Sequence, residues 1–485
     1  MKSLHKLIHK LNPTEKRYIK MRLNVNKSDS ELSQYFEVFV EEENYDIAKL
    51  ELIFNKPSKL LRANFGKLYA TILKNLRLYH HKSSAEYEMH GTLADVELLL
   101  NKGMVEEAQK SNEKLIELAK EKESFYVLVK AYSYGWTIYH LSGNLTAKNA
   151  HLLQKRMNDY ISRHFEIELI TDIHRKALVF YNEYFFIKRN ENTKLKISTL
   201  VDHPLLADIH ALSTDQSRML FYEIWSIHHS IHQKVEEHYE TRRQQFELVF
   251  HSKVYVDDYV NKVLILGNLC SFFVYKNDMR SLKKYFSFFQ KHFSLVIENS
   301  SDSVFIEKYY DVYLQCKIHL TKFNGKKDAA DLMYKEALPI LTEKIQINSN
   351  LIGRTYWALA ELFILHDQPK EALKLIIHFQ DIYKSNRSSN YFLESEIGLI
   401  IVYHVLKKDD EFDKKIEYVQ RKAKEKKYIL AQDHKVIMEV FRYISKNYQK
   451  DTKKLLEYSN KIKLNTLYKA FVNSLVSGKS LNESQ

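Results

Sequence analysis

The sequence predicts an all-α protein, an α-solenoid of stacked helix-turn-helix repeats that follows an N-terminal helical cap. Two observations carry this prediction. The 485 residues include only 10 Gly and 5 Pro, so the frequent turn residues that strand-rich folds need are missing. A pattern of helix, short turn and helix also recurs at a near-constant interval along the chain, which is typical of solenoids.

The stretch 323–341 (FNGKKDAADLMYKEALPIL) contains the repeated pattern in its clearest form. Gly325 ends one helix, and the small Ala330 follows five residues later in the next helix. The same spacing separates Gly103 from Ala108. A small residue lets two helices approach closely, and a larger residue one turn later fills the groove beside it. Because one helix pair cannot bury both of its apolar faces, each pair is expected to pack on the next.

Equivalent positions recur every 39–48 residues through most of the chain. The positions near 195, 238, 414 and 453 are weak in residue type and are placed by turn signals at 190–193, 232–234, 409–410 and 447–451. Turns are also expected at 143–144 and 366–369. The assigned positions are Ala108, Lys148, Leu195, His238, Leu282, Ala330, Ala372, Lys414 and Lys453. This spacing predicts about nine helical pairs over residues 83–465.

The pattern resembles the tetratricopeptide repeat (TPR), and the match is best over residues 353–386. Two residues depart from the family, because Ala360 replaces its Gly and Lys384 replaces its closing Pro. Most units also exceed the family's length of about 34 residues. The resemblance implies a right-handed superhelix whose first helices line a concave groove. The matching residues are Tyr356, Leu359, Ala360, Phe363, Ala372, Ile376 and Phe379.

Residues 1–82 are predicted to form a separate basic helical domain, and residues 466–485 a final helix with a short tail. Helices are expected at 2–11, 13–24, 29–41, about 44–54 and 58–79. The residues Asn12 to Glu15 predict a helix start with reciprocal capping, and so do Ser213 to Gln216. The opening residues also resemble those of uncharacterised bacterial helical-repeat proteins, which implies no activity.

Positive charge is concentrated at the two ends of the chain. Residues 1–82 have 16 Lys and Arg against 9 Asp and Glu, and residues 407–485 have 19 against 11, out of a net +13. Basic ends can contact nucleic acid, an anionic surface or an acidic protein, or they can serve solubility alone.

Several features predict a cytoplasmic protein. Cys270 and Cys316 are the two cysteines, too few for a disulfide framework. No signal peptide is readable at the N-terminus. The longest apolar run, residues 397–406, is shorter than the roughly 20 residues of a membrane span. No integral membrane segment is therefore expected.

Two groups of residues have the character of metal ligands, each with a structural alternative. His228, His232 and Glu236 are spaced by four and would share one helical face, which either binds a metal or is a polar surface. Cys316 and His319 share a face as well, but two ligands do not make a site. We therefore predict no metal site.

Two further fragments resemble catalytic motifs. His366-Asp367 resembles the dyad of metal-dependent phosphohydrolases but lies in a repeat turn. Residues 477–480 (SGKS) end like a phosphate-binding loop, yet Asn473 stands where that loop needs Gly. The sequence therefore predicts no catalytic residues, no cofactor and no enzymatic activity.

The TPR resemblance implies a partner-binding groove on the first helices of two consecutive units. Trp357 is its best anchor, because aromatic side chains dominate interface energies; packing between repeats is the alternative. Trp136 and Trp225 are expected in the core. The predicted groove residues are Gln315, His319, Lys322, Arg354, Trp357 and Glu361.

A basic patch is predicted on the first two helices, where a basic amphipathic helix either docks on an anionic partner or presents a solvated face. The run 414–428 is similar, but interleaved Glu417 and Glu425 favour a solvated helix. The predicted patch consists of Lys2, Lys6, Lys10, Lys16, Arg17, Lys20 and Arg22.

Two functions remain open from the sequence. The first is a cytoplasmic scaffold or adaptor whose solenoid groove binds a protein or peptide. The second is a regulator whose basic N-terminal domain contacts nucleic acid while the repeats sense a ligand or peptide. The sequence ranks the scaffold first, because no convincing helix-turn-helix is readable, and it leaves the oligomeric state open.

Overall fold

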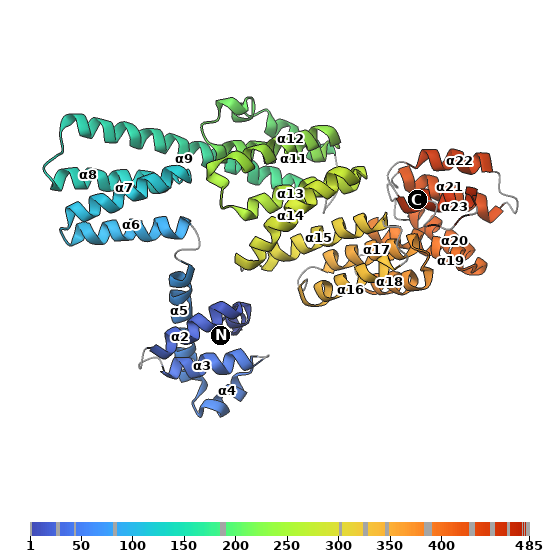
Figure 1. The fold of residues 1–485 in the computed structure, drawn as a ribbon, viewed down its shortest axis with the longest axis horizontal. Helices are drawn as coiled ribbons and strands as arrows, with labels where there is room; N and C mark the ends of the chain where they lie inside the picture. Colours follow the sequence, from blue (N-terminus) through green and yellow to red (C-terminus); the bar gives the residue numbers. More distant parts are fainter. Residues whose placement is uncertain are drawn as a thin grey trace. The chain divides into compact units, whose positions relative to one another are not determined.

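The computed structural model describes most of the chain as helix. The described residues are 2–25, 30–42, 45–80, 85–184, 191–299, 303–323, 328–344, 349–382, 390–425, 432–446, 452–462, 466–477, 479 and 481. Within these ranges the protein forms 23 α-helices and no strand (Figure 1). The predicted all-α class is therefore confirmed. None of the described helices is both long and apolar enough to cross a membrane.

The chain divides into two compact units, a division that the repeat pattern does not reveal. The first unit contains residues 1–258 and 299–301, and the second contains 259–298 and 302–485. The predicted boundaries after residues 82 and 465, which separate the repeats from the N-terminal domain and the C-terminal helix, stay predictions.

The N-terminal helices match the predicted ones to within a few residues. They bury an apolar core whose members all lie between Leu4 and Leu76. The predicted helix start at Asn12 is confirmed. The side-chain oxygen of Asn12 accepts the Glu15 N–H at 2.8 Å, and the Glu15 carboxylate accepts the Asn12 N–H at 2.9 Å. The helices are α1 (Lys2–Lys10), α2 (Pro13–Val25), α3 (Ser30–Glu41), α4 (Ile47–Phe54) and α5 (Ser58–His80).

In the rest of the first unit, most helices pack with their neighbours in sequence. Helices α6 to α9 lie side by side, and α11 packs on both α9 and α12 (Figure 1). Three short 3-10 turns, η3 (Pro204–Leu206), η4 (Ile209–Ala211) and η5 (Lys253–Tyr255), complete this unit. The helices are α6 (Ala85–Asn101), α7 (Val105–Glu121), α8 (Phe125–Leu141), α9 (Ala147–Asn182), α10 (Glu191–Val201), α11 (Asp215–Ile231) and α12 (Val235–His251).

The second unit repeats the helix pair. One apolar core of this unit runs from Leu314 to Leu481 and includes all seven residues that match the TPR pattern. Helix α16 is followed by one π-helical turn, η6 (Ile340–Lys344). The helices are α13 (Tyr259–Lys276), α14 (Met279–Asn299), α15 (Ser303–Lys322), α16 (Ala329–Pro339), α17 (Ser349–Leu365), α18 (Pro369–Ile382), α19 (Asn390–Val405), α20 (Asp409–Glu425), α21 (Gln432–Lys446), α22 (Thr452–Lys461) and α23 (Thr466–Ser477).

One turn geometry recurs between helices. Its central residue has a left-handed backbone, and its N–H bonds to the carbonyl three residues back while the next N–H bonds five residues back, which is the Schellman arrangement. Among the described residues, glycine fills this position twice, and other residues adopt it five times despite the steric cost. The positions are Gly103, Glu123, Gly143, Gln233, Asn277, Asp367 and Lys407.

These turns set the register of the buried positions. Ala108, Leu282, Ala330 and Ala372 are all fully buried, as the repeat pattern predicts. The assignments of Lys414 and Lys453 are wrong, since both are exposed. Buried Phe412 and Leu455 take their places. Phe412 stands five residues after Lys407, the same interval that separates Gly103 from Ala108.

The regular spacing of buried repeat positions is also interrupted in the first unit. Leu195 is 66% exposed and lies on the short helix α10, so the pair predicted there does not form with the repeat spacing. Helix α9 has 36 residues, about twice the length of α7 or α8. Lys148 is exposed and His238 half-buried, so neither acts as the small buried residue. Gly325 and residues 447–451 lie outside the described part of the chain.

Candidate functional site

The predicted groove residues on α15 and α17 come together, but they contact one another. The Lys322 ammonium lies 2.7 Å from the Glu361 carboxylate, and the two side chains are only 10% and 13% exposed. Such a pair leaves neither charge available to a partner. The ion pair connects α15 and α17, which are the first helices of two neighbouring helix pairs.

Two more predicted residues also contact other parts of the chain. The Gln315 amide is 3.4 Å from the Thr355 hydroxyl, which in turn donates to the buried Asp311 carboxylate at 3.2 Å. His319 lies 3.0 Å from the Asn277 side-chain oxygen. Burial, with repulsion from Lys322 as the second cause, lowers the pKa of His319 to about 3.

Trp357 is buried, with 4% of its surface exposed. Its ring lies over Gly398 of α19 so closely that a Cβ atom added there would be 2.4 Å from the indole. The close approach requires glycine and fixes Trp357 between α17 and α19, which is the packing role that the sequence left open. The Arg354 side chain lies outside the described part of the structure.

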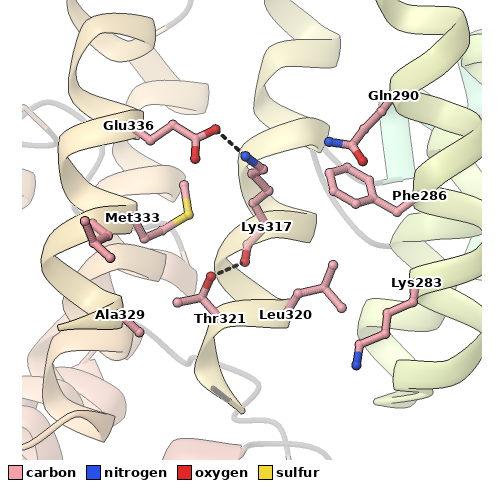
Figure 2. A pocket seen from close by; sticks show the side chains of 10 residues that line it. Lys283, Phe286, Gln290, Lys317, Leu320, Thr321, Ala329, Met333 and Glu336 are labelled. Carbon is pink, nitrogen blue, oxygen red and sulfur yellow. Dashed lines mark hydrogen bonds and ion pairs between the residues drawn. The ribbon is translucent and has the colours of Figure 1, made fainter. Parts of the chain in front are cut away.

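A groove on the second unit is instead lined by α14, α15 and α16 (Figure 2). Its volume of about 480 Å³ is within the range of roughly 300–1,000 Å³ for ligand pockets. Phe286 and Met333 form apolar walls and are nearly buried, while Leu332 is 56% exposed at the rim. Leu332 is therefore the side chain through which the groove exposes apolar surface to a partner.

Charged groups stand on both sides of this groove. Lys317 forms an ion pair with Glu336, and the Tyr313 hydroxyl donates to the same carboxylate at 2.9 Å. Lys283 is exposed on α14 and forms no ion pair within the described residues. One positive charge is thus available beside the apolar walls.

The predicted basic patch is on the surface of the N-terminal domain. Lys16 is half-buried, and the other six members are exposed. Lys20 pairs with Glu37 at 2.8 Å, which reduces the charge that this part of the patch offers. Six of the seven side chains are therefore at the surface, and binding of a partner to this patch stays a prediction.

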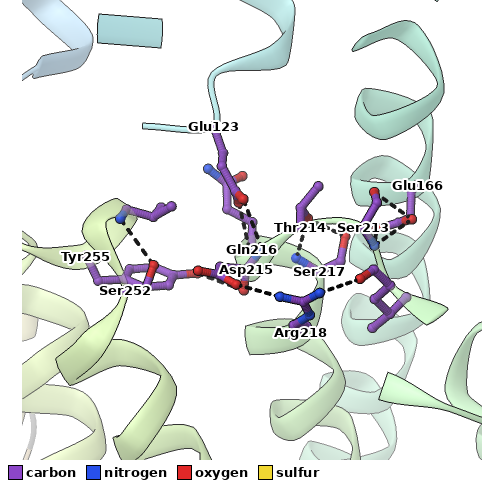
Figure 3. A network of polar contacts seen from close by, with 12 residues as sticks. Glu123, Glu166, Ser213, Thr214, Asp215, Gln216, Ser217, Arg218, Ser252 and Tyr255 are labelled. Carbon is purple, nitrogen blue, oxygen red and sulfur yellow. Dashed lines mark hydrogen bonds and ion pairs between the residues drawn. The ribbon is translucent and has the colours of Figure 1, made fainter. Parts of the chain in front are cut away.

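A polar network in the first unit fixes the start of α11 (Figure 3). The Glu123 carboxylate accepts the N–H groups of Asp215 and Gln216 at 3.1 and 3.0 Å. Burial is the main cause of a raised Glu123 pKa, and these two bonds oppose it. The helix N-terminus is therefore satisfied by a carboxylate of the chain itself.

The predicted capping box at Ser213 is shifted by one residue. Thr214 is the cap, and its hydroxyl oxygen accepts the Ser217 N–H at 2.9 Å. Ser213 instead donates its N–H and hydroxyl to Glu166. Gln216 does not reach back to the cap, because its amide donates to the Lys122 carbonyl at 3.2 Å.

The histidine group does not share one helical face, contrary to the expectation from its spacing. His228 and His232 are close, with ring centroids 4.5 Å apart, but α11 ends at Ile231 and the turn at Gln233 places Glu236 on α12. The predicted common face is therefore broken. Burial is the main cause that lowers the His228 pKa to about 4. Nowhere in the described ranges do three His, Cys, Asp or Glu side chains group as a metal site would require.

Cys316 is a buried structural thiol. Hydrogen bonding with Cys270 and burial raise the pKa of Cys316 well above its usual value, which keeps the thiol protonated and unreactive. Of the other two Trp residues, Trp225 packs against a core as expected, whereas Trp136 is 38% exposed and corrects that prediction.

The two fragments that resemble catalytic motifs have structural contacts. His366 is buried beside the Thr321 carbonyl at 3.3 Å, and the Asp367 carboxylate accepts the Leu481 N–H at 3.1 Å. In the run 477–480, residues 478 and 480 lie outside the described part of the chain, so no loop geometry is assigned.

Comparison with protein-family models gives no match, and comparison with curated proteins gives none either.

The groove on α14–α16 is not predicted from the sequence, because the TPR resemblance implies partner binding on the first helix of each pair. A signal was present in the repeat itself. In α16 the buried stripe is Ala330, Met333 and Ala337, and Leu332 lies off it. An exposed Leu beside a buried stripe would have indicated an apolar surface.

Proposed function

We propose that the protein is a non-enzymatic, cytoplasmic scaffold that holds a segment of a partner protein in the groove between α14, α15 and α16. The partner segment packs an apolar side chain on Leu332, above the buried Phe286 and Met333, and places a carboxylate near Lys283. The observation that carries this proposal is the open apolar groove with an exposed Leu332 and an unpaired cation at its edge.

The repeat pattern supports a binding role. Helix pairs with one recurring turn geometry extend the TPR resemblance beyond its best-matching unit, and they are consistent with a TPR-like right-handed solenoid. Such repeats present extended surfaces on which peptide segments bind. The groove uses the second helices α14 and α16 with α15 between them, rather than the first helices alone.

The contacts of the sequence-predicted groove support the same choice of site. Lys322, Glu361 and Trp357 make internal contacts, and a partner would have to break those contacts to use them. The groove on α14–α16 requires no such rearrangement, because Leu332 and Lys283 are exposed already.

The test compares two exposed leucines in the second unit. Leu332→Glu places a charge in the groove, and Leu456→Glu, at a side chain 49% exposed on α22, is the matched control. Affinity purification of the full chain from its native cell, with quantitative mass spectrometry, should recover a partner with wild type and L456E that is lost with L332E. Recovery of the same proteins at the same levels with all three would contradict the proposal.

A further inference from the structure

Helix α5 of the N-terminal domain carries only positive charge. Its 23 residues include Lys59, Arg62, Lys67, Lys74 and Arg77 and no Asp or Glu. The acidic residues of this domain lie earlier, at Glu15 and between positions 29 and 51. Charge within the domain is therefore segregated, and α5 is its most strongly basic element.

The cations of α5 share a face that the domain does not use. Leu61, Phe65, Leu68 and Ile72 are fully buried on one side of the helix. The five cations are all exposed, and none forms an ion pair within the described residues. From Lys59 to Arg77 they extend along about 27 Å of helix, at 1.5 Å per residue.

The middle of this face is flat because its residues are small. Ala63, Gly66 and Ala70 are exposed and follow Lys59 at steps of three or four residues, which places them on one line that continues to Lys74 and Arg77. A Cβ atom added at Gly66 would meet nothing within 4 Å. Packing within the domain does not require this mid-helix glycine, although glycine weakens a helix.

We propose that this face of α5 binds the phosphate backbone of duplex DNA. The flat strip of Ala63, Gly66 and Ala70 lets the helix axis approach the duplex, and the cations along its length contact phosphates. A straight helix of this length fits the major groove of B-form DNA, which is about 12 Å wide. Because the contacts are to phosphates, the binding is independent of base sequence.

The side chains on this face favour duplex DNA over other anionic partners. A membrane-surface helix needs large apolar side chains to enter the lipid, and the exposed Leu60 and Leu78 of α5 lie beside the strip rather than on it. Single-stranded nucleic acid binds through stacking on aromatic rings, and the partly exposed Tyr69 also lies beside the strip. Duplex RNA has a deep, narrow major groove that excludes a helix.

The test is a fluorescence anisotropy titration of the full-length protein with a 24-base-pair DNA duplex of arbitrary sequence, repeated over a range of salt concentrations. The logarithm of affinity should fall linearly with the logarithm of salt concentration. Lys67→Glu with Lys74→Glu should weaken binding by about tenfold or more and reduce the salt slope by about 2.

Matched variants separate charge on α5 from overall charge. Lys110→Glu with Lys114→Glu on α7 changes the net charge equally at exposed positions and should leave affinity near that of wild type. Gly66→Ala should retain binding, and Gly66→Tyr should weaken it without loss of helical circular dichroism. The proposal is overturned if the α5 and α7 variants bind alike, or if vesicles of anionic lipid compete with the duplex at equal phosphate concentration.

Discussion

The charged side chains of α15 and α17 and those of α5 have opposite surroundings. Lys322 and Glu361 are buried and paired, and the nearby histidine is neutral because it is buried. Lys67 and Lys74 on α5 are exposed and make no ion pair within the described residues. The same residue types therefore stabilise helix packing in one region and remain available to a partner in the other.

Two glycines, Gly398 on α19 and Gly66 on α5, also have opposite surroundings. Gly398 is required by the Trp357 ring that lies over it, whereas Gly66 has open space where a side chain would be. A residue whose absence of side chain is explained by packing has a structural role. One that packing does not explain points to a contact outside the protein.

Loss of Trp357 tests the buried side of this comparison with the largest expected effect. Trp357→Ala should destabilise the second unit by about 3–5 kcal/mol, because it leaves a large cavity between α17 and α19. Chemical denaturation followed by circular dichroism measures this. Trp136→Ala, at a ring 38% exposed, is the control and should cost clearly less. Equal losses would show that Trp357 is not a core residue.

Breaking the buried ion pair should have the next largest effect. Lys322→Ala should cost about 3 kcal/mol, since Glu361 is then buried without its partner. The double substitution Lys322→Met with Glu361→Leu removes both charges and should recover most of that loss in the same denaturation experiment. If the double variant were no more stable than the single one, the pair would not explain the effect.

The pH dependence of stability follows from His319. Its folded pKa of about 3 lies below its unfolded value, so the unfolded state binds more protons between these values. Stability is fully present above about pH 6.5 and should fall as pH decreases towards 3, by at most about 1.4 kcal/mol per pH unit for this residue.

Unfolding followed by Trp357 fluorescence at pH 7 and pH 5, with Trp136 and Trp225 replaced by Phe, measures this effect in the second unit. His319→Gln can keep a contact with Asn277 without titrating, so it should flatten the pH dependence. An unchanged pH dependence in that variant would assign the effect to other groups.

The smallest predicted effect is a gain in stability at Gly66. Gly66→Ala should stabilise the N-terminal domain by about 0.5–1 kcal/mol, because alanine favours a helix and has room there. The same substitution at Gly398 should destabilise, since its Cβ atom would clash with the Trp357 ring. Thermal melts of both variants show whether each substitution raises or lowers stability. A loss of stability in Gly66→Ala would indicate packing around Gly66 that the structure does not contain.

Much of the fold could be predicted from the sequence because helix boundaries depend on local signals. The five N-terminal helices and the capping at Asn12 are predicted closely. The turns at Gly103 and Gly143 were read from glycine. The repeat position is wrongly assigned to Lys414 because the preceding turn has Lys407 in the left-handed conformation, and a lysine does not indicate a turn as a glycine does.

The candidate site could not be predicted in the same way. Whether a charge such as that of Lys322 faces a partner or a buried carboxylate depends on a residue 39 positions away, Glu361. A repeat pattern places both on first helices but does not reveal that they meet. Exposure of Leu332 and Lys67 likewise depends on packing, although each lies off its buried helix stripe in the sequence.

The most direct measurement determines stability and DNA affinity in the same pair of variants, Lys322→Ala and the double variant Lys67→Ala with Lys74→Ala. The account predicts that Lys322→Ala loses about 3 kcal/mol of unfolding free energy and binds the DNA duplex as wild type does. The double variant should keep its stability within about 0.5 kcal/mol and bind with a lower affinity and a smaller salt slope. Equal DNA affinities in the two variants, or equal losses of stability, would contradict the division between buried, paired charges and exposed, unpaired ones.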